Sequence, residues 1–183
     1  LPKATNASKR SIEAFAEKAA GILGYEVGEE IEPIVKKLGG RLHYQWYSVE
    51  ETCDVGLRIP ESIPKFASDH YSGVLVVKGP IDFDILLSPY TGILRDRFSI
   101  AHELGHYFLH SRQGETPLVA ARMDSELPEW EANWFAAAFL MPEGKLREFW
   151  EKRPHDSYAG ASFFQVSQQA YEVRAKSLGL ILD

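Results

Sequence analysis

The stretch FSIAHELGHYFLH, residues 98–110, decides what kind of domain this chain forms. Its apolar residues recur at the spacing of one helix face: Phe98, Ala101, Leu104, Gly105 and Phe108. His102, Glu103 and His106 lie on or near the more polar side of the same helix. We therefore expect a helix over residues 95–110 whose two histidines border the core rather than fill it.

The two histidines are four residues apart, which on a helix places both rings on one face, one turn apart, within reach of one ion. Glu103 lies between them, where a carboxylate reaches a water bound to that ion. This H-E-x-x-H pattern is a signature of metalloproteases. Zinc lowers the pKa of its water to about 7 and polarises the scissile carbonyl, and a glutamate takes the proton. The sequence thus predicts a zinc metallopeptidase with His102 and His106 as metal ligands and Glu103 as the catalytic base.

A third ligand is expected from a second helix, predicted over 128–141, and Glu131 is the first candidate. Glu131 falls on the apolar face of that helix, where an unpaired carboxylate is costly and a metal ion removes the cost. Glu129 points elsewhere and is the alternative ligand. The competing interpretation is an ion pair between Glu131 and an arginine such as Arg95, Arg97 or Arg122. Two histidines and one glutamate with an open fourth position are typical of a catalytic zinc site.

The roles of two further polar residues, His110 and Asn133, remain open. His110 continues the histidine stripe, but it lies about 12 Å along the axis from His102, too far for a shared zinc ion. We expect it to support the site or to serve the structure alone. Asn133 is interpreted either as a residue that holds a ligand in place or as an ordinary helix residue.

The whole chain is expected to form one α+β domain, residues 1–183, in which a small antiparallel sheet packs against a mostly helical region. Residues 1–40 are predicted as N-terminal helices (8–23 and 29–38), 41–90 as the sheet, and 91–183 as the helical region with the zinc site. The expected strands are 42–49, 54–59, 73–78 and 82–87. Residues 112–126 are expected to form a loop, and the later helices to cover 143–150 and 166–178.

Composition limits the partners. The 20 basic residues are scattered and outnumbered by 26 acidic ones, for a net charge of −6, so direct binding of nucleic acid is not expected. The longest apolar run, 134–141, is too short to cross a membrane. Cys53 is the single cysteine, which excludes an internal disulfide and a cysteine-rich zinc site. With no signal-peptide pattern at the first residues, we expect a cytoplasmic protein.

Three segments resemble the ImmA/IrrE family of zinc metallopeptidases: residues 97–110 (RFSIAHELGHYFLH), 131–142 (EANWFAAAFLMP) and 164–180. The resemblance implies His102, His106 and Glu131 as zinc ligands and Glu103 as the base. By their chemistry, the same ligands are also able to hold Mn²⁺ or Fe²⁺. It also implies a bacterial or phage-related stress-response protease that cleaves a helix-turn-helix transcriptional repressor. Because residues before 41 leave no room for a DNA-binding domain, we expect that repressor to be a separate protein.

Two alternatives stay beside this prediction. A metallopeptidase-like domain can bind a regulator or toxin without cutting it, but such a partner has no need of Glu103 between its two metal ligands. A peptidase of the cell envelope requires a leader peptide, which these residues do not show. The substrate's identity, its cleavage site, the oxyanion-stabilising residue and the oligomeric state are left open.

Overall fold

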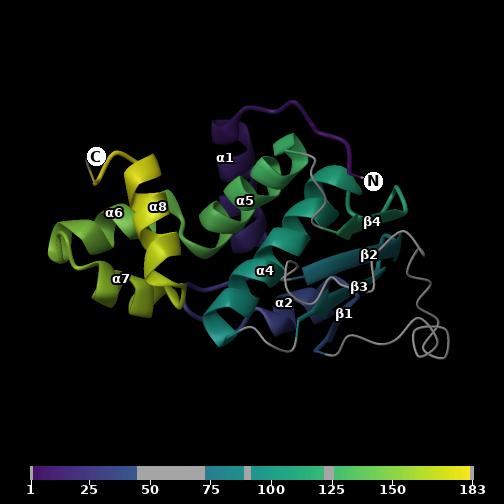
Figure 1. Ribbon diagram of the computed structural model, residues 1–183, viewed down its shortest axis with the longest axis horizontal. Coiled ribbons are helices and arrows are strands. Elements are labelled where there is room, and N and C mark those ends of the chain that lie inside the picture. The colour runs from purple at the N-terminus through teal and green to yellow at the C-terminus, as the bar shows by residue number, and fades with distance from the viewer. Residues whose placement is uncertain (1, 45–72, 89–91, 122–125, 182–183) are drawn as a thin grey trace.

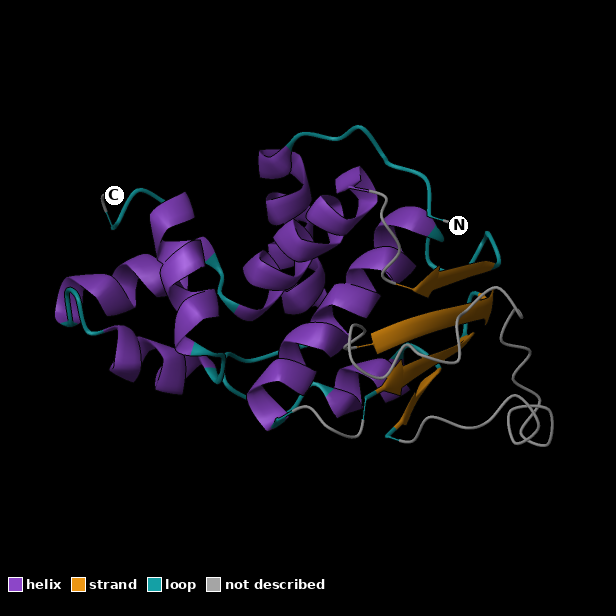
Figure 2. Ribbon diagram, viewed as in Figure 1, coloured by secondary structure: helices purple, strands orange, loops and turns teal. Residues whose placement is uncertain are grey.

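The computed structural model describes residues 2–44, 73–88, 92–121 and 126–181. A small sheet lies at one end of the molecule, and the helices occupy the rest, with the C-terminal helices grouped at the opposite end (Figure 1 and Figure 2). The α+β prediction is confirmed. The predicted strand 54–59 and the end of strand 42–49 lie outside the described residues.

The sheet has four strands in the order β1-β3-β2-β4. They are β1 (Gly40–His43), β2 (Gly73–Gly79), β3 (Asp82–Leu87) and β4 (Leu118–Ala121). The hairpin of β2 and β3 is antiparallel, as expected, and β4 adds antiparallel to β2. The sheet is nevertheless mixed, because β1 pairs with β3 in parallel, so the expectation of a purely antiparallel sheet is corrected. β4 also replaces part of the loop that the sequence predicts over 112–126.

An ion cluster around the buried Asp84 holds β1 beside β3. Arg41 and Asp84 are partners in the parallel register. The guanidinium donates from Nε to Asp84 Oδ1 at 2.7 Å and from Nη2 to Oδ2 at 2.9 Å, while His43 Nε2 and Lys78 Nζ also contact the carboxylate. Burial alone would raise the pKa of Asp84, but these hydrogen bonds outweigh it and lower the pKa to about 2. Asp84 is therefore a charged anchor between two strands.

Helices cover one face of the sheet. The N-terminal helix α1 (Lys9–Leu23) lies beside α5 (Glu126–Leu140), and α5 crosses α4 (Ile93–Gly105), which in turn packs on β2 and β3 (Figure 1). Alternate strand residues join this core: Leu75, Val77, Phe83, Ile85 and Leu87. The short α2 (Glu32–Lys37) leads into β1. The period-2 pattern of the strands and the period-3.6 pattern of the helices thus meet in one apolar interior.

The helices end where the sequence indicates. Ser8 caps α1 by accepting the N–H of Ser11 at 3.2 Å, and Gly24 ends it in the left-handed conformation at φ 74°. After α5 the chain forms α6 (Glu143–Lys152), α7 (Ser157–Phe164) and α8 (Gln168–Ser177), of which α7 is not predicted from the sequence. None of the described helices is both long and apolar enough to span a bilayer.

Candidate metal centre

His102 and His106 project from the C-terminal end of α4 toward α5. Their Nε2 atoms lie 3.2 Å apart. The carboxylate of Glu129 on α5 faces both rings, with Oε2 3.2 Å from His102 Nε2 and Oε1 3.3 Å from His106 Nε2. Among the described residues, these three form the group that is able to hold a metal ion.

The spacing of these atoms fits a tetrahedral zinc site. Zinc bonds to histidine nitrogen and carboxylate oxygen are about 2.0–2.2 Å long, which at tetrahedral angles puts ligand atoms about 3.3–3.5 Å apart. The two Nε2 atoms are 3.2 Å apart, and each faces its own oxygen of Glu129, at 3.2 Å for His102 and 3.3 Å for His106, so each separation is close to that value. Two imidazoles and one carboxylate leave a fourth position for water or substrate, which distinguishes a catalytic site from a closed structural one.

Glu103 follows His102 on α4 and is 4% exposed. Its carboxylate lies against the first residue of β2, since a Cβ built on Gly73 would stand 3.0 Å from Glu103 Oε1 and 3.3 Å from its Cγ. A residue with any side chain at position 73 would therefore press on this carboxylate. The glycine leaves room for Glu103 at the edge of the candidate site.

Asn133 resolves one of the open alternatives, because its Oδ1 lies 2.9 Å from His102 Nδ1. Glu129 and Asn133 are four residues apart on α5 and so share one face, which is turned toward His102. An amide oxygen at Nδ1 accepts the ring N–H and leaves Nε2 with its lone pair for a metal, which is the usual arrangement behind a metal-bound histidine. The two helices meet closely here, with Gly105 of α4 against Ala132 of α5.

The structure does not bring Glu131, the expected third ligand, to this cluster. Its Oε2 lies 2.9 Å from His110 Nε2, and Thr5 donates to it from the N-terminal segment. Glu129 takes the place instead. The physical reason is helix phase: two residues apart on a helix means about 200° around the axis, so both glutamates cannot face the same two histidines. Glu131 is buried, as expected, and its described partners are His110 and Thr5; Arg95 and Arg97 are not among them, and Arg122 lies outside the described residues.

His110 lies behind the cluster. The helix widens after Gly105 into a π-helical turn, His106–His110, in which Ser111 N–H donates to His106 O at 3.0 Å. Such turns occur often at functional sites. His110 Nδ1 lies 2.9 Å from His106 Nδ1, on the side of the ring away from Glu129. The expectation that His110 is not a ligand agrees with this placement.

Burial and hydrogen bonds set the charges of the cluster. Burial lowers the pKa of His106 to about 4, so that its ring is neutral near pH 7. Burial would raise the pKa of Glu129, but hydrogen bonds with the two histidines lower it to about 2. Burial opposes ionisation of Glu131 in the same way, and hydrogen bonds from Thr5 and His110 outweigh it and lower its pKa. Neutral imidazoles and an ionised carboxylate are the forms in which these groups bind metals.

Comparison with protein families agrees with this site. The family described as peptidase M78, the IrrE N-terminal-like domain, matches residues 61–176, well over half of the chain. The chain belongs to peptidase family M78. No curated protein sequence matches it. Membership confirms the resemblance to ImmA/IrrE proteins and supports a metallopeptidase-like function with a metal cofactor. The match covers α4, α5 and the helices that follow, and hence all four of His102, Glu103, His106 and Glu129.

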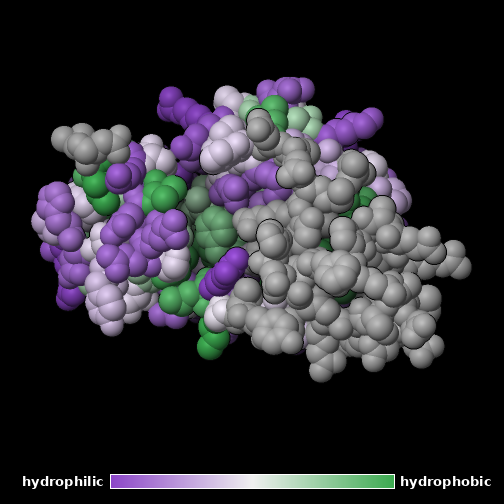
Figure 3. All heavy atoms as spheres, in the orientation of Figure 1, coloured by the Kyte–Doolittle hydropathy of each residue, from purple (hydrophilic) through white to green (hydrophobic). Residues whose placement is uncertain are grey.

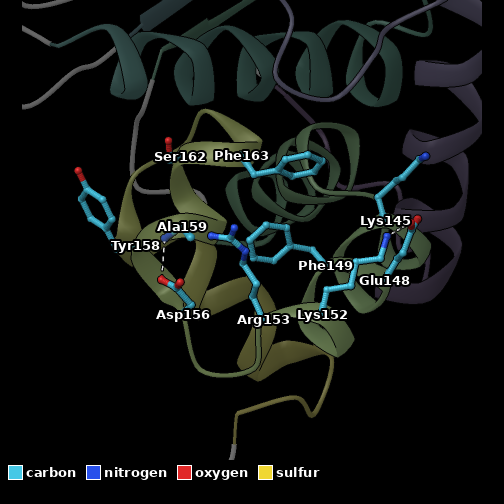
Figure 4. Close-up of a pocket in the computed structure, with 10 residues that line it drawn as sticks. All are labelled: Lys145, Glu148, Phe149, Lys152, Arg153, Asp156, Tyr158, Ala159, Ser162 and Phe163. Carbon is cyan, nitrogen blue, oxygen red and sulfur yellow. Dashed lines mark hydrogen bonds and ion pairs between the residues drawn. The ribbon is translucent and has the colours of Figure 1, made fainter.

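The cluster of His102, His106 and Glu129 does not line either of the two larger hollows found on the described part of the surface. One hollow, of about 740 Å³, lies between α6 and α7 and is lined by Phe149 and Phe163 with the basic side chains Lys152 and Arg153 beside them (Figure 4). It contains no residue of the metal cluster. The C-terminal part of the molecule around it shows a largely hydrophilic face in Figure 3, with a few apolar residues between the polar ones.

A second hollow adjoins the site. This groove of about 700 Å³ runs between α1, α4, α5 and α8, and Ser99, Trp130 and Asn133 are among its lining residues. Asn133 thus contacts His102 on one side and the groove on the other. The sequence does not reveal this groove, and it names Glu129 only as the alternative to Glu131, because both depend on how α5 is rotated against α4.

Proposed function

We propose that this M78 domain is a zinc-dependent endopeptidase that cuts a protein substrate. His102, His106 and Glu129 would hold the ion, and Glu103 would act as the general base. The observation that carries the proposal is that two Nε2 atoms 3.2 Å apart each face an oxygen of the Glu129 carboxylate, at 3.2 and 3.3 Å, beside Glu103, which is not one of these three residues. A purely structural site would use a fourth protein ligand.

The bound metal would supply an acidified water and a polarised carbonyl. Glu103 accepts a proton from the attacking water and returns it to the leaving amine, a role worth about 10²–10⁴ in rate. Its burial beside Gly73 limits the positions that its carboxylate can take. Asn133 orients His102 through Nδ1, and Glu129 contributes the negative charge that offsets part of the charge of the cation.

Zinc is the proposed metal because two imidazoles and one carboxylate in near-tetrahedral spacing suit it best, while Mn²⁺ is able to occupy the same donors. We propose a separate helix-turn-helix repressor as the substrate and the cytoplasm as the place of action. Support for the substrate comes from the resemblance to ImmA/IrrE proteins, and the acidic net charge of −6 fits a partner that is not DNA.

Cleavage is tested with the purified chain loaded with Zn²⁺ and the helix-turn-helix repressor encoded nearest to its gene. Wild type, Glu103→Gln and Glu129→Ala are compared on a gel, with bound metal measured in each sample. We expect discrete fragments from wild type, at least a 10²-fold slower reaction from Glu103→Gln with its metal retained, and loss of both metal and cleavage in Glu129→Ala.

Equal cleavage by wild type and Glu103→Gln would contradict the assigned base. Wild type that holds zinc and binds the repressor without cutting it would replace the proposal with the alternative of a non-catalytic binding partner. A Glu143→Gln variant is the control for the ligand assignment: it removes a carboxylate that pairs with Arg147 on α6, outside the cluster, and we expect it to keep its metal.

A further inference from the structure

We propose that Thr5, Glu131 and His110 form a hydrogen-bond relay that holds His106 in the tautomer and orientation needed to bind the metal. This inference rests on the proposed function, because it concerns the same ion. It makes the segment before α1 a part of the metal centre, although 126 residues separate Thr5 from Glu131. Thr5, Glu131 and His110 are positioning residues, because in this chain of hydrogen bonds only His106 would touch the ion.

The direction of each hydrogen bond follows from the carboxylate. An ionised carboxylate only accepts, so at 2.9 Å His110 Nε2 must carry the proton that points to Glu131. The Nδ1 atom of a neutral His110 is then an acceptor. It lies 2.9 Å from His106 Nδ1, which must therefore be the donor. The lone pair of His106 is left on Nε2, the atom that faces His102 Nε2 and Glu129.

Thr5 fixes the far end of the relay. Its backbone N–H donates to both carboxylate oxygens of Glu131, at 3.1 and 2.9 Å, and its hydroxyl donates to Oε1 at 2.7 Å. The side chains of His110 and Glu131 are both 0% exposed, so the contact between them is shielded from water, while Thr5 lies at the surface. In Figure 1 the segment before α1 runs past the end of α5 toward the chain's N-terminus near β4.

The two metal-binding histidines are thus supported differently. His102 is held directly by the amide of Asn133, from α5. His106 is held through a second imidazole, which the π-helical turn brings to its Nδ1. Because partners behind a metal ligand typically contribute about 10–100-fold in metal affinity, the relay predicts that residues remote from the ion change its binding.

The test measures zinc affinity by competition with a chromophoric chelator, together with the visible absorption spectrum of the Co²⁺-loaded protein and the thermal midpoint of the metal-free protein. The variants are His110→Phe, His110→Asn and Thr5→Val. Glu13→Gln is the matched control, since the ion-pair partners of Glu13 among the described residues are Lys9 and Arg174, and neither belongs to the metal cluster or to the relay. All are made in the full chain.

We expect His110→Phe to bind zinc about 10–100-fold more weakly and to shift the Co²⁺ spectrum. His110→Asn places an amide oxygen where Nδ1 stood, so it should recover part of the affinity. Thr5→Val loses the hydroxyl but keeps the N–H, so a severalfold loss is expected, about threefold to tenfold. Glu13→Gln should lower the thermal midpoint and leave zinc affinity and the Co²⁺ spectrum unchanged.

If His110→Phe and Thr5→Val bind zinc as wild type does, the relay is wrong while the proposed function stands. If Glu13→Gln weakens zinc as much as Thr5→Val, the effect comes from general stability and the relay is again overturned. If His110→Phe does not fold, the Asn and Thr5 variants decide. Wild type that binds neither zinc nor Co²⁺ would overturn the proposed function itself, and the relay with it.

Discussion

A Gly105→Ala substitution should weaken the contact between α4 and α5, the two helices that position the residues of the candidate site. A Cβ built at Gly105 stands 3.0 Å from Ala132 Cα, 3.1 Å from Ala132 O and 3.2 Å from Phe135 Cβ. Carbon atoms pack best at about 3.5–4.0 Å, so the helices must separate by about 0.5 Å. Two of the three atoms belong to the backbone, and a change of rotamer does not relieve the contact.

The magnitude follows from two opposing contributions. Overpacking of this kind costs about 1–3 kcal/mol. Alanine in place of glycine in a helix contributes about 1 kcal/mol in the other direction. Gly21 in α1 provides the matched control, because nothing lies within 4 Å of a Cβ built there, so Gly21→Ala keeps only the favourable contribution. The free energy of unfolding of Gly105→Ala should therefore fall below that of Gly21→Ala by about 1–3 kcal/mol.

Thermal unfolding followed by circular dichroism, with the metal removed by a chelator, measures this difference. For a chain of this size it corresponds to thermal midpoints about 2–12 °C apart. Zinc affinity should also fall in Gly105→Ala, since Glu129 and Asn133 move with α5 while the two histidines stay on α4. A Gly105→Ala protein as stable as Gly21→Ala would show that the helices do not meet at this glycine.

Three other outcomes are expected. The methyl group of Gly73→Ala should press on the carboxylate of Glu103. We expect kcat to fall about tenfold with zinc affinity unchanged, because small displacements of reacting groups slow the reaction. An unaltered kcat would contradict this prediction. Asp84→Asn should lower the free energy of unfolding by about 2 kcal/mol near neutral pH. This loss in the free energy of unfolding should shrink as the pH falls from 3.8 toward about 2, because a carboxyl group with a lowered pKa in the folded protein stabilises the fold above its unfolded pKa. Urea titrations that give the same loss at every pH would refute this reasoning. Zinc at 100 times its Kd should stabilise wild type and Glu103→Gln by about 2.7 kcal/mol and Glu129→Ala hardly at all, as thermal shifts would show.

The pair of histidines and the intervening glutamate could be predicted because they depend on one helix alone. A spacing of four residues puts His102 and His106 on one face wherever that helix packs. The caps at Ser8 and Ser167 are equally local, since each side chain accepts an N–H three residues ahead within its own segment. The β2–β3 hairpin follows from two β-rich runs joined by a Gly-Pro turn.

Which glutamate joins His102 and His106 was decided by tertiary structure. Helix α5 is buried around much of its circumference, so its apolar pattern does not say which of Glu129 and Glu131 faces α4. Contact between Gly105 and Ala132 sets that rotation. It turns Glu129 to the histidines and leaves Glu131 under the N-terminal segment, where Thr5 neutralises part of the cost of burial.

The remaining differences have the same origin. Hydrogen bonds between Arg41 and Asp84, which are 43 residues apart in the chain, support the parallel pairing of β1 with β3. Strand β4 forms by pairing with the edge of β2. A residue pattern records which side chains share a face of their own element, since that depends on the backbone repeat. Which face meets which neighbour depends on partners distant in the chain, and only the packed structure brings those partners together.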